Sequence, residues 1–540
     1  MNFQLTDDHV FVCVPSHYKT YAEELGGVYS KRQDAHRFPK NYHVLRELAK
    51  AFPELTQDLQ FIDAGRRLNE ARQRVAAMKS REDTVGDPRL RPYQRVDVEY
   101  LKHLPNALIG NAPRTGKTPT SIMLLKELGT KKNLVIAPAS LIWNWAQEIQ
   151  TWMPEANIYV TSGTPKKRSG IYNSYVADKG IKVLIVSKDT WKADYAKEWP
   201  GEVWNTVFVD EAHFLRNYKT AQSKAIYAIK AKHRFAITGT PAVKHPSDVW
   251  GILHFLYPQK FTSYWQFVER YFEIGFDFMG HKEIGPVMEH RREELEELVS
   301  FISVQRKRSE VMKWLPKKQA QTIPVHMEGK QAKLYEQMRD DFIAKLEGED
   351  HAVDTSGVLP QLMRLRQLCL DPRLVGFDVE GEKTKVIHEW LEDNEQPVVI
   401  MSMFTSYLKL LKPELEKLGL VVGMIHGEMD NKSKNQAAQD FQSGKSDVLL
   451  CNIISAGLGF TLDRAETVIF TDKAWNPAEN EQAEDRIIPV SQERNHSVNI
   501  ISFTCSDTVD ERIDRIVANK RSLTDVINQG GLTALRRLLS

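Results

Sequence analysis

The amino-acid sequence predicts an α/β protein in which two parallel-sheet lobes follow a small α+β domain. Two series of short apolar strands alternate with helical segments, and this alternation is typical of parallel sheets. Only the first series begins with a glycine-containing turn that leads into a helix. The expected strands lie near 133–137, 183–186, 207–210 and 234–237 in the first series, and near 397–401, 421–425, 448–451, 467–470 and 498–501 in the second.

The length of 540 residues indicates about three domains. Hydrophobic and charged shares of 42% and 27% are those of ordinary globular proteins, so large cores are possible. With a net charge of +2, any basic surface must be local. The predicted domains are an accessory domain over 1–85, a first lobe over 86–320 with an insertion at about 260–304, a helical linker over 321–383, and a second lobe over 384–540.

The cysteines favour a reducing compartment, because they lie far apart and form no CxxC pair that would indicate zinc or a disulfide framework. The N-terminus lacks the basic and apolar stretches of a signal peptide, and no apolar run is long enough to cross a membrane. We therefore expect a cytoplasmic protein. The four cysteines are Cys13, Cys369, Cys451 and Cys505.

The N-terminal region combines an expected strand over 10–14, a hairpin over 26–39, a helix over 42–52 and a charged connector helix over 59–78. Two interpretations remain open. The region is either a small α+β cap or a DNA-binding accessory domain whose contacts would come from Arg32, Arg37, Phe38 and Lys40.

A phosphate-binding turn is predicted between the apolar run at 107–109 and a helix that continues to Leu128. Backbone N–H groups around Gly116 can cradle a phosphate at that helix N-terminus. Lys117 would reach the β- and γ-phosphates, and the Thr118 hydroxyl would bind Mg²⁺. The pattern is imperfect, because Asn111 occupies the place of the usual first glycine.

Two carboxylates, Asp210 and Glu211, stand at the carboxyl end of the strand expected at 207–210. Open α/β sheets bind their ligands at the carboxyl ends of strands, and adjacent side chains there can take different roles. Asp210 can hold hydrated Mg²⁺, while Glu211 can polarise the water that attacks a γ-phosphate. A lone Asp-Glu pair is usually a solvated turn, but the upstream phosphate loop favours ATP hydrolysis, with ATP between the two lobes.

Two kinds of segment have a structural and a functional interpretation. The aromatic-rich insertion at about 260–304 is better explained by local packing than by base stacking. The basic runs at 166–168 and 306–308 are either solvated surface or part of a DNA track, and the second has the better case because it lies within a longer motif.

The motifs between Gln94 and Gln482 resemble the Snf2 family of superfamily 2 DNA-dependent ATPases, most of all its annealing-helicase branch. The resemblance covers about 91–520 and rests on ordered, specific stretches. They are Asp210-Glu211-Ala212-His213, Thr238-Gly239-Thr240-Pro241, Gln305-Arg306-Lys307-Arg308, Leu365-Arg366-Gln367-Leu368-Cys369, Ile425-His426-Gly427, Ser455-Ala456-Gly457-Leu458-Gly459, Trp475-Asn476-Pro477 and Gln482-Ala483-Glu484-Asp485-Arg486.

The resemblance implies two RecA-like lobes and a role for each matching position. Gln94 would contact adenine, and Gln482 and Arg486 would face the γ-phosphate from the second lobe. Backbone contacts to DNA would hold a strand without reading its sequence. These contacts are implied for Ser140, Ser187, Lys188, Ser455 and Gly457.

The sequence departs from the family pattern at two places. Pro489 stands where the family has a second arginine, the arginine finger, and Arg494 is a candidate substitute. The phosphate loop has Pro113-Arg114-Thr115 where the family has Met-Gly-Leu. The N-terminal region resembles the HARP domain of annealing helicases through its hairpin at 26–39 and Val44-Leu45, which implies recognition of branched or forked DNA.

These features predict an ATP- and Mg²⁺-dependent DNA translocase that remodels or anneals forked or duplex DNA in replication or repair. A strand-separating helicase shares the same motor core and remains an alternative. A non-catalytic DNA-binding scaffold is a second alternative, motivated by Pro489, although the retained Lys117, Asp210 and Glu211 argue against it.

Overall fold

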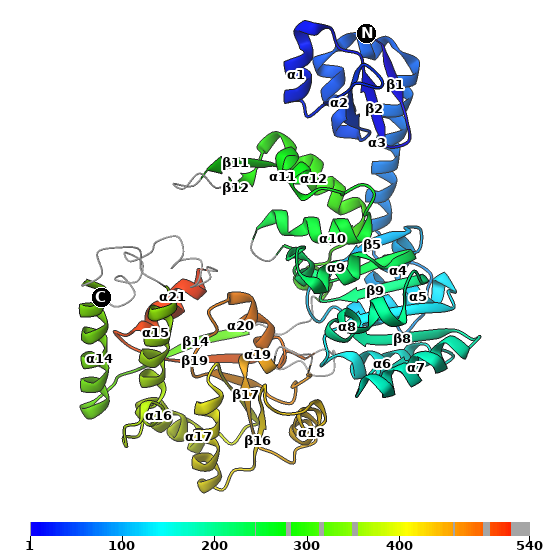
Figure 1. The fold of residues 1–540 in the computed structure, drawn as a ribbon. Coiled ribbons are helices and arrows are strands. Elements are labelled where there is room, and N and C mark those ends of the chain that lie inside the picture. The colour runs from blue at the N-terminus through cyan, green and yellow to red at the C-terminus, as the bar shows by residue number, and fades with distance from the viewer. Residues whose placement is uncertain are drawn as a thin grey trace. The chain divides into compact units, whose positions relative to one another are not determined.

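The computed structural model describes residues 2–242, 245–276, 282–312, 318–347, 355–456, 460–489 and 497–519 (Figure 1). The chain divides into two compact units, Met1–Val311 and Met312–Ser540. The division falls slightly before the boundary near 320 predicted from the sequence. Each unit contains a parallel sheet, and the first also has two small antiparallel sheets, so the predicted α/β class is confirmed.

The N-terminal domain is a four-stranded antiparallel sheet with strand order β1-β2-β4-β3, packed on helices. The predicted hairpin forms β3 and β4, which pair antiparallel. Helix α3 enters the core of this domain with Phe61 and Ala64, and its last turns reach the first lobe through Val75 and Met78. The elements are β1 Phe3–Leu5, β2 His9–Val12, α1 Lys19–Glu24, β3 Val28–Ser30, β4 Ala35–Pro39, α2 Tyr42–Ala51 and α3 Leu59–Lys79.

Strand β4 corrects one predicted DNA contact. Phe38 is fully buried in the core of the N-terminal domain, whereas Arg37 beside it is exposed. Successive side chains of a strand point to opposite faces, so the two residues cannot share one surface. Lys40 donates from its amine to the Thr6 carbonyl at 2.8 Å. Phe38 is therefore unavailable to stack on bases.

The first lobe is a seven-stranded parallel sheet with strand order β13-β5-β10-β9-β6-β8-β7. Alternate residues of β6 enter different cores, with Leu134 and Ile136 in one and Val135 and Ala137 in the other. Both faces are covered, as expected for a parallel sheet. The elements are α4 Pro92–Leu101, β5 Asn106–Ile109, α5 Lys117–Leu128, β6 Lys132–Ala137, α6 Ile142–Trp152, β7 Asn157–Val160, α7 Pro165–Ala177, β8 Lys182–Ser187, α8 Lys188–Glu198, β9 Val203–Asp210, α9 Ala221–Tyr227, β10 Lys230–Ile237 and α10 Val249–Leu256.

The predicted insertion forms a helix, a β-hairpin and a second helix, and then β13 rejoins the sheet beside β5. Phe267, Tyr271 and Phe272 are buried in a local core, which confirms that these aromatic residues serve packing. The elements are α11 Tyr264–Tyr271, β11 Phe272–Phe276, β12 Lys282–Val287, α12 Glu289–Phe301, β13 Ser303–Val304 and α13 Arg308–Val311.

The N-terminal domain is fastened to α12 by buried charges. The Arg291 guanidinium donates to Glu47 at 3.0 Å and to the Leu25 carbonyl at 2.5 Å, and Asn41 donates to Glu294 at 3.0 Å. Gly26 has a positive φ of 81°, and a Cβ there would lie 2.9 Å from the Arg291 guanidinium. The absence of a side chain at Gly26 thus leaves room for the Arg291 guanidinium.

The second unit is a six-stranded parallel sheet with strand order β14-β19-β18-β15-β17-β16. Strand β14, which the sequence analysis missed, is a mostly exposed edge strand. Because it pairs with β19 over its whole length, the start of the predicted linker belongs to this sheet. The elements are β14 Lys318–Val325, α14 Gly329–Glu347, α15 Thr355–Leu370, α16 Glu382–Glu392, β15 Val398–Ser402, α17 Thr405–Lys417, β16 Val422–Ile425, α18 Asn431–Gln442, β17 Val448–Asn452, α19 Ile453–Ala456, β18 Thr467–Phe470, α20 Pro477–Glu484, β19 Val498–Cys505 and α21 Val509–Ala518.

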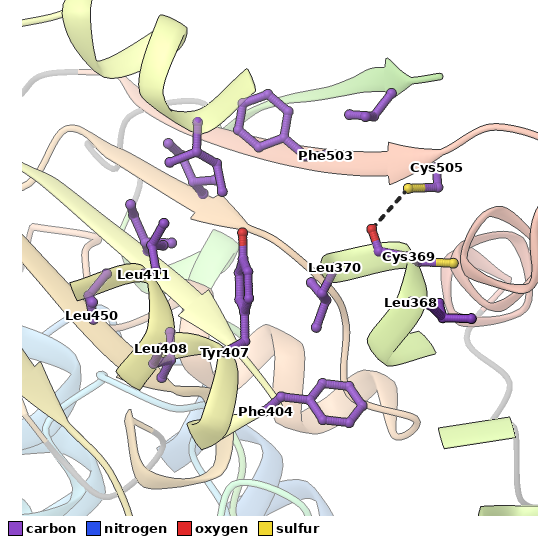
Figure 2. Close-up of a cluster of buried hydrophobic side chains, with 14 of the residues drawn as sticks. Leu368, Cys369, Leu370, Phe404, Tyr407, Leu408, Leu411, Leu450, Phe503 and Cys505 are labelled. Atoms are coloured by element: carbon purple, nitrogen blue, oxygen red, sulfur yellow. Dashed lines mark hydrogen bonds between the residues drawn. The ribbon is translucent and has the colours of Figure 1, made fainter. Parts of the chain in front are cut away.

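One core of this unit lies between the sheet and helices α15 and α17 (Figure 2). Tyr407 and Phe503 are buried there together with Leu368. The Cys505 thiol donates to the Cys369 carbonyl at 3.2 Å. All four cysteines are free thiols, so no disulfide links the helices to the sheet.

Candidate nucleotide site and nucleic-acid interface

The predicted catalytic segments of the first unit meet at one edge of its sheet. Strand β10 lies between β5 and β9, and its last residue, Ile237, is in register with both Ile109 and Asp210. All three strands are parallel, so the segments that follow them leave the sheet side by side. The phosphate loop, the Asp-Glu pair and the segment beginning at Thr238 therefore occupy one edge, where ligands of open α/β sheets bind.

The phosphate loop ends at Gly116, which has a left-handed φ of 79° and caps the N-terminus of α5. Lys117 is the first residue of the helix, and its amine donates to the Ala112 carbonyl at 3.3 Å, so its side chain turns back over the loop. Thr118 lies in the first turn and is half-buried. The loop, the lysine and the hydroxyl are thus arranged around the positive end of a helix, as anion binding requires.

Helix α4 holds the end of this loop. The Tyr93 hydroxyl donates to the Thr115 carbonyl at 2.7 Å, and the Gln94 amide donates to the Thr115 and Gly116 carbonyls at 3.1 and 3.2 Å. The Gln94 amide oxygen accepts from the Arg91 N–H at 2.8 Å. A Cβ at Gly116 would lie 2.2 Å from the Gln94 nitrogen. Gln94 therefore supports the loop in this structure, and its contact with adenine stays a prediction.

The carboxylate of Asp210 is buried at the end of β9. It accepts from the Trp145 indole at 2.8 Å and from the Glu211 N–H at 2.9 Å. Burial, followed by the charge of Glu211, raises the pKa of Asp210 to about 6, while the Trp145 bond and the nearby Lys117 charge act in the opposite direction. A cation bound between the phosphate loop and the end of β9 would offset the negative charge of Asp210 and Glu211.

Mg²⁺ commonly takes one or two protein oxygens and completes its shell with waters and substrate phosphates. The Asp210 carboxylate and the Thr118 hydroxyl offer such a donor set. Among the described residues, no group of three or more His, Cys, Asp or Glu side chains could hold a metal by itself. The residues present therefore fit an ion that is shared with a nucleotide.

Glu211 is linked to the strand end of β10 through a histidine. Its carboxylate lies 3.1 Å from His213 Nδ1, and this nitrogen lies 3.4 Å from the hydroxyl of the buried Thr238. The Thr238 hydroxyl also accepts from the Thr240 N–H at 3.1 Å. Glu211 has a left-handed φ of 48°, and its side chain is 38% exposed, so a water can reach it.

The predicted phosphate contacts of the second unit lie one helical turn apart. Gln482 belongs to α20, and Arg486 lies in the turn that follows it. The Arg486 carbonyl accepts from the Leu462 N–H at 2.8 Å, which ties this turn to the segment after β17. Pro489 is buried, and Arg494 lies outside the described residues.

The predicted DNA contacts have different surroundings. Ser187 is buried, and its hydroxyl caps α8 by accepting from the Thr190 N–H at 3.1 Å. The Lys188 amine lies 5.1 Å from the centre of the Phe214 ring, and Ser140 is half-buried in the loop after β6. Ser455 is buried, and its Oγ would lie 3.8 Å from a Cβ added at Gly427. Gly457 lies outside the described residues.

Both basic runs contain an arginine that is committed to an internal carboxylate. Arg168 donates to Asp194 at 2.6 and 2.7 Å. Arg306 donates to Asp97 at 2.9 and 2.8 Å. These two side chains therefore belong to the folded interior of the first unit, whereas Lys307 remains 82% exposed.

Sequence reasoning did not predict the supporting contacts that Trp145, Tyr93 and His213 make. The partners in these contacts lie 65, 22 and 25 residues away in the chain, so no local sequence pattern predicts them. They are Asp210, Thr115 and Thr238, respectively. The parts of the chain that the structure describes contain no helix long and apolar enough to cross a membrane.

Two family models and several known proteins match this chain. The SNF2-related domain matches residues 43–374, and the helicase conserved C-terminal domain matches residues 382–489. The Bacillus subtilis protein named putative ATP-dependent helicase/translocase YwqA is 28% identical over 468 residues, which cover 82% of this chain and 49% of that protein. An uncharacterized ATP-dependent helicase of Mycoplasma pneumoniae is 26% identical over 449 residues, which cover 80% of this chain and 42% of that protein.

The Sulfolobus solfataricus SWI2/SNF2 ATPase core in complex with dsDNA is 24% identical, with a TM-score of 0.37, and the match covers 86% of this chain and 97% of that one. The chain spans about half the length of the curated relatives named above. Because the SNF2-related domain alone matches more than half of the sequence, this chain belongs to the SNF2-related family.

Proposed function

We propose that this chain hydrolyses ATP and couples hydrolysis to movement along DNA. The observation that carries the proposal is the shared sheet edge, where the loop ending in Gly116-Lys117-Thr118 lies beside the buried Asp210 and the accessible Glu211. The names of the relatives, helicase and translocase, support the same activity.

Each side chain then has a chemical task. Lys117 would exchange its bond to the Ala112 carbonyl for a nucleotide phosphate, and Glu211 would orient the attacking water and accept its proton. Thr118 and Asp210 would hold Mg²⁺, which when bound neutralises charge on the β- and γ-phosphates. From the second unit, Gln482 and Arg486 would contact the γ-phosphate, and Gln94 would contact adenine.

The proposed DNA contacts are with the backbone and are made by Ser140, Lys188, Ser455 and Gly457, with Ser187 shaping the start of α8. Remodelling or annealing of forked DNA is the finer proposal. Support for it comes from the resemblance of the N-terminal domain to HARP and from the exposed Arg37 on its hairpin. Strand separation is the alternative within the same motor.

The test is ATP turnover by the purified chain without DNA and with single-stranded, duplex and forked DNA. We expect duplex or forked DNA to raise turnover, and Glu211→Gln to abolish it, because general-base catalysis contributes roughly 10²- to 10⁴-fold. Glu155→Gln, which removes only a surface ion pair with Lys126, is the matched control and should turn over normally.

Absence of turnover with every DNA, together with retained DNA binding, would instead support the scaffold alternative and a motor inactivated at Pro489. If turnover occurs, a forked duplex labelled on both strands separates the two motor activities. Closure of the fork supports annealing, and release of a strand supports unwinding.

A further inference from the structure

The phosphate loop begins with Asn111 where such loops usually have glycine, and the structure shows what the amide does. Asn111 is fully buried. Its Nδ2 donates to Asp97 Oδ2 at 2.8 Å, and its Oδ1 accepts from the Arg306 N–H at 2.9 Å. Both ends of the side chain are therefore used. A glycine at this position could make neither bond.

The two partners of Asn111 also bind each other. Asp97 is fully buried, and its Oδ1 accepts from Arg306 Nε at 2.9 Å and from Nη2 at 2.8 Å. Asp97, Arg306 and Asn111 thus each contact the other two, and we call this set the triangle. The single negative charge of Asp97 is balanced by the single positive charge of Arg306. Removing one partner from such a buried pair leaves the other uncompensated, so each member depends on the other two.

This triangle holds the start of the loop, while the same helix holds its end. Helix α4 supplies Tyr93 and Gln94 to the Thr115 and Gly116 carbonyls and, one turn later, Asp97 to Asn111. Residues three or four apart share a side of a helix, which explains how one helix reaches both ends. The loop is therefore fixed at both ends by a single rigid element.

Two further contacts tie the triangle to its surroundings. The Ala112 N–H donates to the Arg306 carbonyl at 3.0 Å, so the segment after β13 runs alongside the loop. The remaining arm of Arg306 donates to the carbonyl of Lys79, the last residue of α3, at 3.1 Å. The C-terminus of α3, the helix that connects the N-terminal domain to the first lobe, is thus hydrogen-bonded to Arg306, which also contacts the phosphate loop.

We propose that Asp97, Asn111 and Arg306 are positioning residues that set the phosphate loop in its nucleotide-binding shape, and that Asn111 replaces the usual glycine for this purpose. None of the three would touch the nucleotide. The inference rests on the proposed function only in requiring that this loop bind nucleotide.

The decisive experiment exchanges the amide and the carboxylate. Asp97→Asn leaves Arg306 without its counter-charge, and Asn111→Asp places two carboxylates in contact. The double variant Asp97→Asn/Asn111→Asp again has one carboxylate and one amide beside Arg306. Loss of a buried charged hydrogen bond predicts that each single variant binds ADP roughly tenfold more weakly by calorimetry, and that the double variant recovers most of the affinity.

A control separates positioning from stability. Asp194→Asn breaks a matched pair with Arg168 in the same unit. It should lower the melting temperature and leave the affinity for ADP unchanged. If Asp97→Asn and Asn111→Asp do the same, or if the exchange recovers no affinity, the three residues are only structural and the proposal is overturned.

If Asp97→Asn or Asn111→Asp does not fold, Asn111→Gly provides the test instead. It restores the residue that phosphate loops usually have and adds no charge, yet we expect weaker ADP binding because both bonds are lost. Unchanged or tighter binding would contradict the positioning role. Failure of the unaltered protein to bind ADP would instead reject the proposed function, so the two failures are distinguishable.

Discussion

The two parallel sheets both carry a buried carboxylate near the ends of their strands, but the two carboxylates differ in what neutralises them. Asp472, just after β18, pairs with the buried Arg366 at 3.0 Å and accepts from the Ser402 hydroxyl at 2.5 Å. Burial raises its pKa, and Arg366 opposes the rise. Asp210 instead faces Glu211 and receives neutral donors from Trp145 and the backbone.

The surroundings of the two carboxylates distinguish a structural carboxylate from a candidate ligand site within one fold. A carboxylate whose charge is matched inside the protein already has its partner, and removing that partner destabilises the fold. A buried carboxylate beside a second one, with neutral hydrogen-bond donors and a nearby lysine that only partly offsets its raised pKa, is better satisfied by an external cation. We therefore expect the edge of the first sheet to bind a cation, whereas Asp472 in the second sheet already has one in Arg366.

The largest effect that we predict from this comparison is in the second unit. Arg366→Met would leave Asp472 buried without its cation, and breaking such a pair costs about 3–5 kcal/mol. Denaturant titration should show this loss in the free energy of unfolding. Arg515→Met, which removes only an exposed pair with Glu511, is the control and should change it by less than about 1 kcal/mol. If both variants lowered the free energy of unfolding equally, Asp472 would not depend on Arg366 for its neutralisation.

A smaller effect is expected at Trp145. Trp145→Phe keeps an aromatic ring and removes the donor to Asp210, so the carboxylate loses its orientation. Loss of a hydrogen bond to a charged group predicts a decrease of kcat of roughly tenfold or more in DNA-stimulated ATP turnover.

Helix α6 itself provides the matched control for that variant. Trp152 donates to Glu148 at 3.0 Å, away from Asp210, so Trp152→Phe should preserve kcat. If Trp145→Phe also preserves kcat, the indole has no part in placing Asp210.

The smallest effect concerns Ser187, whose hydroxyl already has a partner. Ser187→Ala should reduce the free energy of unfolding by about 1 kcal/mol, as loss of a helix N-cap does. Affinity for duplex DNA, measured by fluorescence anisotropy, should change little. A large loss of affinity at unchanged stability would make Ser187 a direct DNA contact after all.

The sequence was sufficient for features that depend on local pattern. Apolar runs located ten strands of the two parallel sheets. The turn before α5 and the end of β9 indicated Gly116, Lys117, Asp210 and Glu211. It was insufficient where a partner is distant, as for Asn111 with Arg306 or Trp145 with Asp210.

Two misjudged features have simpler physical causes. Phe38 follows an exposed Arg37 in a strand, so the two-residue period already places its ring in the core. Strand β14 is polar because it is an exposed edge strand, and an apolar search passes over it.

Nucleotide binding measured with and without Mg²⁺ would show whether Asp210 holds the metal ion. Calorimetry with ADP would compare the unaltered chain with Asp210→Asn and with Asp472→Asn. We predict that Mg²⁺ tightens ADP binding in the unaltered chain and in Asp472→Asn, at a temperature where the latter is folded, and that Asp210→Asn loses this response. A response to Mg²⁺ that survives in Asp210→Asn would contradict the assignment of the site to the edge of the first sheet.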